Sequence, residues 1–266
     1  MIEAILLARK FIQYSLLFVC VATTSCSIQN DTKKNELVIF AASSLTNVFE
    51  DLANEFESKH PDTNIALSFG SSSQLAAQIL EGVSGDIFAS ANEFQMDLIQ
   101  NAGEIIELPA IFSTNNLIIV VPFENPLNIQ ELKDLTQPNI RLVLAVPKTP
   151  IREYSDQVIK NNLSNTEQLK LYKNLASEEA NVRQVVTKIA LGEADAGIVY
   201  SSDITPQNSA LLLGIPIPFQ QNITAQYPIA ILKSNHNQKL AEDFMDFVLS
   251  EDGQLIIKKW GFGEKP

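Results

Sequence analysis

Residues 36–56 read "ELVIFAASSLTNVFEDLANEF", and the pattern changes from strand to helix within this stretch. The apolar run at residues 37–42 predicts a buried strand. After it, apolar residues recur three or four positions apart and predict an amphipathic helix with one face on a sheet: Leu45, Val48, Phe49, Leu52, Ala53 and Phe56. Ser43 and Ser44 lie at the junction of the two elements. A buried strand followed directly by such a helix is typical of α/β proteins.

The strand-to-helix unit recurs along the chain. Short apolar runs predict further strands at residues 65–69, 86–90, 117–122, 142–146, 196–200 and 228–232. Two more helices are well marked, one at residues 71–82, where the sequence is "SSSQLAAQILEG", and one at about residues 181–191. Gly82 and Gly192 are predicted to end them. We therefore expect an α/β fold around a largely parallel sheet.

The composition excludes some classes of protein. The 266 residues are enough for one large or two medium α/β lobes, and 45% of them are hydrophobic, which is too apolar for a disordered chain. The formal net charge of -12 argues against a nucleic-acid partner, because binding to phosphate backbones needs clustered Lys and Arg. The sequence has no cluster of Cys and His with metal-ligand spacing, so we expect no bound metal cation and no cofactor.

The first 26 residues carry the pattern of an export signal: two basic residues, an apolar run at about residues 11–22, and small residues up to Cys26. The run is short for a bilayer span, which needs about 20 apolar residues, so a retained anchor is the second choice. Cys26 with the polar residues 27–35 resembles a bacterial lipoprotein start, with a lipidated cysteine and a tether. Simple cleavage near Ser25, which leaves a soluble secreted protein, is the alternative. Either way we expect a periplasmic or cell-surface location.

Serines mark both of the first two strand-to-helix junctions, in "FAASSL" and "SFGSSSQL". Ligands of open α/β sheets lie outside the carboxyl ends of the strands, so both clusters are predicted to face one cleft. Helix starts carry unpaired N–H groups and partial positive charge, and serine hydroxyls add further donors without formal charge. The alternative is that Ser44 and Ser72 only cap their helices. The pairing of two such junctions favours an anion site.

A catalytic role has no supporting residues. A nucleophilic serine needs a base, and the two histidines, His60 and His236, lie in polar, turn-like stretches. The segment "FGSSSQ" lacks the second glycine of a G-x-S-x-G elbow. We expect a binding protein rather than an enzyme. A secreted serine hydrolase and an adhesion or assembly lipoprotein are the alternatives from other classes.

Four stretches together resemble the molybdate-binding protein of bacterial molybdate ABC importers, a type II periplasmic binding protein: "VIFAASSLTNVFEDLANEF", "SFGSSSQLAAQILEGVSGDIFASAN", "NVRQVVTKIALGEADAGIVYSSD" and "QYPIAILK". The resemblance implies two α/β lobes that close around one dehydrated tetrahedral oxyanion. The first lobe would comprise residues 36–118 and 228–266, and the second residues 119–227. Two crossover segments would join them. The C-terminal helices, at about residues 238–250 and 252–259, would pack on the first lobe.

The resemblance also implies which residues hold the oxyanion. Ser44 and Ser72 match family serines that donate from hydroxyl and backbone. Val182 in "NVRQ" and Ile151 in "TPIREYS" match positions that donate a backbone N–H. Tyr200 in "GIVY" matches a tyrosine whose hydroxyl reaches the ligand from the second lobe.

Arg152 departs from the family, which has glycine at this position of a P-[AV]-G-x-Y segment. Such a change could alter the turn or bring a guanidinium near the cleft. We expect instead a solvated side chain on the first helical turn, because Glu153 beside it offers a partner.

The choice of ligand follows from the donors. A fully ionised oxyanion offers only acceptors, whereas a phosphate-type site would include a carboxylate to accept the ligand proton. Asp86 is the nearest candidate for such a carboxylate, and at the start of a strand we interpret it as structural. The resemblance implies molybdate or tungstate as ligand and the permease of an ABC importer as partner, and we expect a monomer. Receptors for sulfate, thiosulfate or phosphate are the nearest alternatives, and an Fe(III) receptor is a weaker one.

Overall fold

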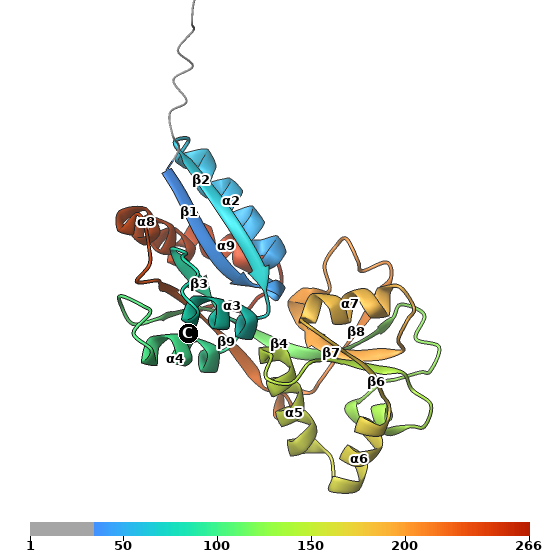
Figure 1. Ribbon diagram of the computed structural model, residues 1–266. Coiled ribbons are helices and arrows are strands. Elements are labelled where there is room, and N and C mark those ends of the chain that lie inside the picture. Colours follow the sequence, from blue (N-terminus) through green and yellow to red (C-terminus); the bar gives the residue numbers. More distant parts are fainter. Residues whose placement is uncertain (1–34) are drawn as a thin grey trace, which may run out of the picture. The chain divides into compact units, whose positions relative to one another are not determined.

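The computed structural model describes residues 35–266, which form a nine-stranded sheet covered by helices (Figure 1). The predicted export signal with Cys26, and the predicted tether up to residue 34, lie outside the described residues. Within the described part of the chain, no helix combines the length and the apolar character that a membrane span requires.

The first lobe contains one end of the sheet, in the order β2-β1-β3-β9. Its strands are β1 (Asn35–Ala42), β2 (Thr63–Gly70), β3 (Ile87–Ala89) and β9 (Thr224–Ile231). Its helices are the short 3-10 helix η1 (Ser43–Leu45), α2 (Thr46–Lys59), α3 (Ser72–Leu80), α4 (Glu93–Asn101), α8 (Gln238–Leu249) and α9 (Glu251–Lys259). The two C-terminal helices pack in this lobe, as we predicted (Figure 1).

Strand β1 is buried on both faces, which explains its continuous apolar run. Leu37, Ile39 and Ala41 face a core shared with α2, α8 and α9. Phe40, on the other face of the strand, packs in a second core with residues of α3 and α4. At the carboxyl end of β1 the chain therefore emerges between two helical layers, at the position of Ser43 and Ser44.

The second lobe contains the other end of the sheet, in the order β4-β7-β5-β6, with β8 also paired to β4. Its strands are β5 (Leu142–Ala145), β6 (Leu175–Glu179), β7 (Ala196–Tyr200) and β8 (Leu212–Pro216). Its helices are η2 (Leu132–Thr136), α5 (Pro150–Asn162), α6 (Asn165–Lys173), α7 (Val182–Ala190), η3 (Ser201–Asp203) and η4 (Phe219–Gln221).

Two long strands connect the lobes. The first part of β4 (Ala110–Pro122) pairs with β9, and from Leu117 onward β4 pairs with β7 along one edge and, from Ile118, with β8 along the other. Asn116 of β4 lies opposite Thr224 of β9. The chain thus leaves the first lobe and returns to it at neighbouring points of one antiparallel ladder. The two-lobe fold is confirmed, while the residue boundaries given above stay a prediction.

The sheet is less uniformly parallel than we predicted. The ladders among β1, β2 and β3, and among β5, β6 and β7, are parallel. Strands β4, β8 and β9 pair in antiparallel fashion, because each connection between the lobes runs back beside the other. Strands β6 and β8 and the first half of β4 were not predicted. The helices at residues 71–82 and 181–191 are confirmed to within two residues, and Gly82 and Gly192 follow them with φ of 88° and 70°.

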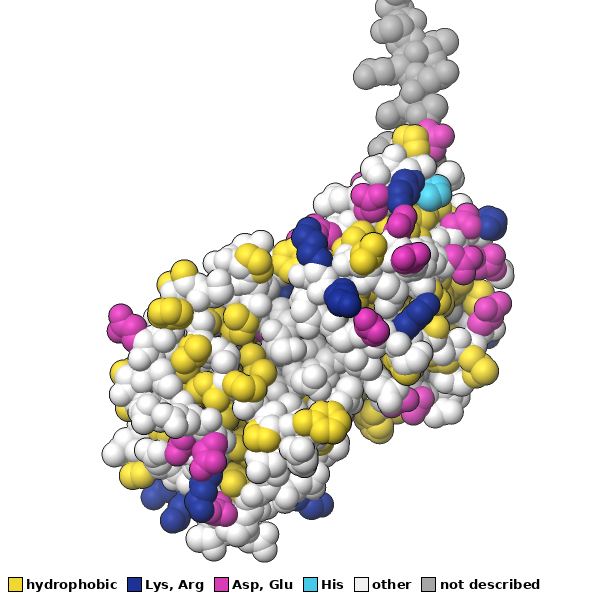
Figure 2. Space-filling model, turned by 180° about the vertical axis from the view of Figure 1, so that it is seen from behind, with side chains coloured by type: hydrophobic (Ala, Val, Ile, Leu, Met, Phe, Trp, Pro, Cys, Tyr) yellow, Lys and Arg dark blue, Asp and Glu magenta, His cyan; other side chains and the backbone are white. Residues whose placement is uncertain are grey.

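Most basic side chains described in the first lobe are paired with acidic ones. Lys59 lies 3.1 Å from Glu55 and 2.9 Å from Asp252, and Lys259 lies 3.0 Å from Asp51. On the face of the molecule that Figure 2 shows, the Lys and Arg side chains are interspersed with Asp and Glu and do not form a continuous basic surface. This distribution does not suit a phosphate backbone.

Candidate functional site

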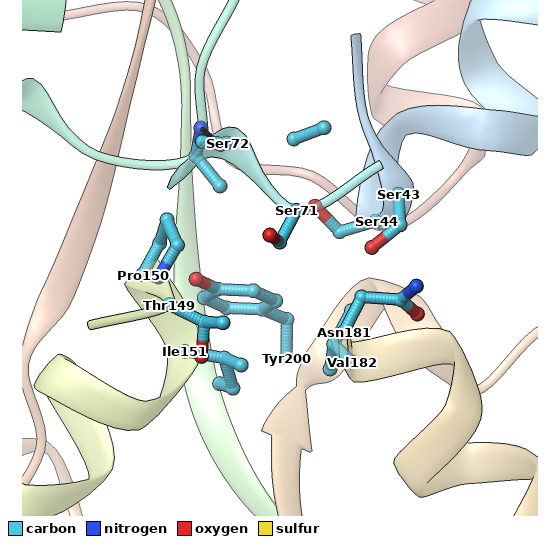
Figure 3. Close-up of a pocket in the computed structure, with 12 residues that line it drawn as sticks. Ser43, Ser44, Ser71, Ser72, Thr149, Pro150, Ile151, Asn181, Val182 and Tyr200 are labelled. Carbon is cyan, nitrogen blue, oxygen red and sulfur yellow. Dashed lines mark hydrogen bonds between the residues drawn. The ribbon is translucent and has the colours of Figure 1, made fainter. Parts of the chain in front are cut away.

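A small cavity of about 20 Å³ lies where the starts of several helices meet (Figure 3). Pockets for drug-sized organic ligands measure roughly 300–1,000 Å³, so this cavity suits only a small ligand. It is lined by Ala42, Ser43, Ser44, Ser71, Ser72, Ala91, Thr149, Pro150, Ile151, Asn181, Val182 and Tyr200.

The structure brings all five predicted contact residues together around this cavity. Ser44 and Ser72 come from the first lobe, and Ile151, Val182 and Tyr200 from the second. In Figure 3 the serines lie on one side, and the ring of Tyr200 lies between the segments that carry Ile151 and Val182. That these residues hold an oxyanion stays a prediction.

Three helix starts offer backbone donors at the cavity. Ser71 caps α3 by accepting a hydrogen bond from the Gln74 N–H, and Asn181 caps α7 in the same way. These caps satisfy the third N–H of each helix, so the first N–H groups, of Ser72 and Val182, have no partner within their own helix. Helix α5 begins with Pro150, which has no N–H, so the N–H of Ile151 is its first donor. Together these termini create a partial positive charge suited to an anion.

The two predicted serines are not helix caps. Ser71, not Ser72, caps α3, and the starts of η1 and α2 have no side-chain cap. The hydroxyl of Ser72 accepts a hydrogen bond of 2.9 Å from the Ala91 N–H, which leaves its hydrogen free to donate. The hydroxyl of Ser44 lies 3.2 Å from that of Tyr227. The capping alternative is therefore wrong for both serines.

Tyr200 ends β7 at the floor of the cavity. Only 1% of it is exposed, and its hydroxyl has no hydrogen-bond partner among the described residues. Burial raises the pKa of Tyr200 well above its ordinary value, so the phenol keeps its proton and remains a donor. Because buried polar groups are almost always paired, this hydroxyl points to an acceptor supplied by a ligand.

The cavity carries polar groups but no charged one. Among the described residues around it, no side chain carries a charge at neutral pH. Asp86 lies outside it, fully buried, and accepts 2.6 Å hydrogen bonds from the N–H groups of Val38 and His236, so the structural interpretation of Asp86 is confirmed. His60 and His236 also lie outside the cavity lining. Within residues 35–266 no group of three or more His, Cys, Asp and Glu side chains is placed to hold a metal ion.

Arg152 differs from our expectation. It is only 8% exposed, and its partners are Asp156, Glu178 and the carbonyl of Ala145 rather than Glu153. The guanidinium carbon of Arg152 also lies over the ring of Tyr172, 5.7 Å from the ring centroid. The side chain therefore points away from the cavity and fastens the start of α5 to the ends of β5 and β6.

Glu153, the partner that we had assigned to Arg152, reaches across the cleft instead. Its Oε2 accepts a 2.9 Å hydrogen bond from Nδ2 of Asn92, at the start of α4. Burial raises the pKa of Glu153, an effect that this hydrogen bond opposes. Close by, the side chain of Gln95 donates to the carbonyl of Lys148. These contacts join the two lobes on one side of the cavity.

We expect Arg152→Met to lower the free energy of unfolding of the ligand-free protein by about 1–3 kcal/mol. Methionine retains the length of the side chain but loses the hydrogen bonds between charged groups, which contribute roughly this amount. Urea denaturation measures the difference. Arg152→Lys keeps the charge without the planar guanidinium, so its free energy of unfolding should lie between those of the parent and of Arg152→Met. Equal stability of Arg152→Met and the parent would mean that desolvation of the guanidinium cancels these bonds.

Four polar residues of the cavity lining were not among the predicted contacts: Ser43, Ser71, Thr149 and Asn181. Sequence signals existed for three of them. Ser71 and Gln74 have the spacing of a capping box, Thr149 precedes a proline at a helix start, and Asn181 is the first residue of a predicted helix. Tyr227, which holds Ser44, had no such signal.

Comparison with known proteins identifies the family of this chain. The model of the family described as bacterial extracellular solute-binding protein matches residues 37–263. The molybdate-binding protein ModA of Mycobacterium bovis is 32% identical over 228 residues, which cover 86% of this chain and 84% of that protein.

Two solved structures share the fold. The periplasmic molybdate-binding protein of Azotobacter vinelandii matches with a TM-score of 0.74 and 23% identity, over 86% of this chain and 100% of that one. The sulfate-binding protein SubI of Mycobacterium tuberculosis matches with a TM-score of 0.75 and 18% identity, over 86% of each chain. The predicted fold, that of type II periplasmic binding proteins, is confirmed.

Proposed function

Because the chain belongs to the bacterial extracellular solute-binding protein family, we propose that it captures molybdate or tungstate outside the cytoplasm and delivers it to an ABC importer. The name of the mycobacterial relative supports molybdate as the ligand. In this function Ser44, Ser72, Ile151, Val182 and Tyr200 donate hydrogen bonds to the four oxygens of the anion.

The observation that carries the proposal is the unpartnered hydroxyl of Tyr200 in a cavity whose other polar groups are mostly donors. A tetrahedral dianion has only acceptors, so it satisfies such donors without leaving one of its own groups unpaired. Preorganised dipoles act strongly at short range in a dry site, whereas the exposed acidic groups are screened beyond about 10 Å at ordinary salt. A net acidic protein can therefore bind an anion.

A receptor for another tetrahedral oxyanion is the second candidate. The fold of the sulfate-binding protein from Mycobacterium tuberculosis is closely similar, and sulfate is also fully ionised. Phosphate is disfavoured, because a protonated oxygen would face a donor in a cavity where the described lining holds no carboxylate. A serine hydrolase is disfavoured as well, because His60 and His236 lie outside the cavity.

The remaining parts of the function concern location and partners. Lipidation of Cys26 would hold the protein at the membrane surface, beside the permease that receives the anion. Closure of the two lobes would supply both retention of the ligand and the shape that the permease recognises. We expect the receptor to act as a monomer.

A thermal-shift and calorimetric panel with molybdate, tungstate, sulfate and phosphate tests the proposed function. A ligand present at 100 times its Kd stabilises the folded protein by about 2.7 kcal/mol, so a tight ligand raises the Tm clearly. We expect large shifts with molybdate and tungstate and small shifts with the other two.

Serine variants serve as controls for this panel. Ser44→Ala and Ser72→Ala should reduce the shift, whereas Ser58→Ala, on the exposed surface of α2, should leave it unchanged. Equal responses to all four anions, or none, would contradict molybdate capture. A response to sulfate alone would favour the second candidate.

A further inference from the structure

Arg183, the second residue of α7, connects the two lobes on the side of the cavity opposite to Asn92 and Glu153. Its Nε donates to the carbonyl of Ser43 at 3.1 Å, and its Nη2 donates to the carbonyl of Ser44 at 3.2 Å. Both carbonyls belong to the serine turn of the first lobe. Val182, next to Arg183 in the chain, lines the cavity.

A fully buried carboxylate holds Arg183 in this position. Oδ1 of Asp203 lies 3.4 Å from Nε of Arg183, which makes an ion pair and not a hydrogen bond, since this oxygen has no hydrogen-bond partner among the described residues. Oδ2 of Asp203 accepts a 3.0 Å hydrogen bond from the N–H of Tyr200. Asp203 is therefore bound both to the arginine and to the backbone of the tyrosine at the floor of the cavity.

These contacts join three groups of predicted donors into one unit: the serine turn, the start of α7 and Tyr200. The hydrogen bonds of Arg183 also affect the direction in which a backbone N–H of the serine turn, Ser43–Ser44, points. The C=O and N–H of a trans peptide point in opposite directions, so an arginine that holds the Ser43 carbonyl fixes the direction of the Ser44 N–H. Thr46 also donates to the Ser43 carbonyl, from its N–H and from its hydroxyl, so Arg183 reinforces a peptide direction that the turn itself favours.

We propose that Arg183, anchored by Asp203, is a positioning residue that fastens the serine turn of the first lobe to the second lobe and so controls how slowly the bound oxyanion leaves. This role rests on the proposed function. Arg183 does not line the cavity, and it acts through the carbonyls that it holds rather than by touching the ligand. Contacts formed on closure of a site are expected to change the dissociation rate more than the association rate.

The chain contains a matched control for this arginine. Arg141 bonds to one carboxylate, that of Asp195 at 2.6 Å, and to two carbonyls, of Gly192 and Glu193, at 3.3 and 3.1 Å. Arg183 likewise pairs with one carboxylate and two carbonyls, although Arg141 is also hydrogen-bonded to both oxygens of its carboxylate. All partners of Arg141 lie within the second lobe, so Arg141→Met removes the same charge and at least as many bonds without cutting a connection between the lobes.

Stopped-flow measurement of molybdate release tests the role. We expect Arg183→Met to accelerate dissociation about tenfold, the typical effect of losing hydrogen bonds from a charged donor. The association rate constant should change by less than about twofold, because closure follows encounter. Arg183→Lys should recover part of the slow release, since an ammonium keeps the charge but cannot bond to all three acceptors in the fork geometry. Arg141→Met should release molybdate at the rate of the parent protein.

The pH dependence of the release rate distinguishes the positioning role of Arg183 from a general effect on the stability of the fold. Arg183, Tyr200 and Tyr227 are the ionisable side chains that act on Asp203, and neither tyrosine titrates below pH 8, since burial raises both their pKa values. Burial raises the pKa of Asp203 to about 6, an effect that Arg183 opposes. Below pH 6 Asp203 takes up a proton and loses its ionic hold on Arg183, so release should accelerate between pH 7.5 and 5. Asp203→Asn should flatten this profile.

The same proton has the opposite effect on folding. The folded state binds it more tightly than the unfolded chain does, so Asp203 makes the fold more stable as pH falls from about 6 towards 4. Faster release at pH 5 is thus not a sign of unfolding. Release by Arg183→Met at the parent rate would overturn this inference and leave the proposed function intact. A parent protein that binds none of the four oxyanions would overturn both.

Discussion

Tyr200→Phe should weaken molybdate binding about 10- to 100-fold and leave the ligand-free protein at least as stable as the parent. A hydrogen bond to a charged acceptor contributes about 1.5–3 kcal/mol, which corresponds to this loss of affinity. In the ligand-free protein the hydroxyl has no partner among the described residues, so its removal breaks no protein hydrogen bond and relieves a buried polar group. Titration calorimetry and urea denaturation of the same samples measure the two effects.

Tyr172→Phe is the matched control for this substitution. The hydroxyl of Tyr172 donates a 2.6 Å hydrogen bond to Asp156, in the second lobe and outside the cavity lining. Its removal should lower stability without altering affinity, which is the reverse of the pattern for Tyr200. Loss of stability in Tyr200→Phe with unchanged affinity would show that the hydroxyl has a structural role only.

Val182→Pro should weaken molybdate binding to a similar degree, about 10- to 100-fold, by removing a backbone donor. Proline is favoured at the first position of a helix, where the N–H has no intrahelical partner. Val182 occupies that position of α7, and Asn181 before it is extended, with φ of −159° and ψ of 171°, as a residue before proline requires. The helix should therefore remain intact, and the substitution removes the N–H with little other change. Calorimetry with molybdate gives the affinity, and circular dichroism reports the helix.

Two controls separate the donor from the side chain and from the proline. Val182→Ala keeps the N–H and truncates the side chain, so it should bind molybdate nearly as tightly as the parent. Glu251→Pro places proline at the same position of α9, which does not line the cavity, and should leave affinity unchanged. If Val182→Ala weakens binding as much as Val182→Pro, packing of the side chain and not the N–H would be responsible.

The two serines could be predicted because they lie where strong local patterns meet, whereas Ile151, Val182 and Tyr200 were assigned from the resemblance to the molybdate-binding family. The helical spacing of apolar residues locates the starts of α2, α3 and α7, and buried runs locate the ends of β1 and β7. Strand ends and helix starts on one edge of a sheet converge, so the serines, Val182 and Tyr200 meet around one cavity. The fold class followed from the same repeating unit.

Other features depend on pairing between distant segments, for which local patterns carry no signal. The sequence of β6, "LASEE", is half polar, and β8, "LLGIP", contains a glycine, so neither predicts a strand by itself. Strand β8 is stabilised by its ladder with β4. The sheet order and the antiparallel pairing of β4 with β9 also depend on contacts between distant segments, so local patterns did not predict them.

Contacts of single side chains with distant residues likewise leave no signal in the local sequence. The sequence beside Arg152 offers Glu153 as a partner, whereas the structure provides Glu178, 26 positions away. Tyr227 contacts Ser44 across 183 positions, and Arg183 reaches Ser43 across 140. These contacts exist only once distant segments have come together, and the contact of Arg183 with Ser43 also needs both lobes.

The pairing of Asn116 with Thr224 makes the second lobe an insertion whose entry and exit lie side by side. A chain that turned directly from β4 into β9 at this point would close the first lobe as a β-hairpin, with its own ladder unbroken. Because both ends of the second lobe meet at this exposed point, the first lobe would need only one short turn to stand without it.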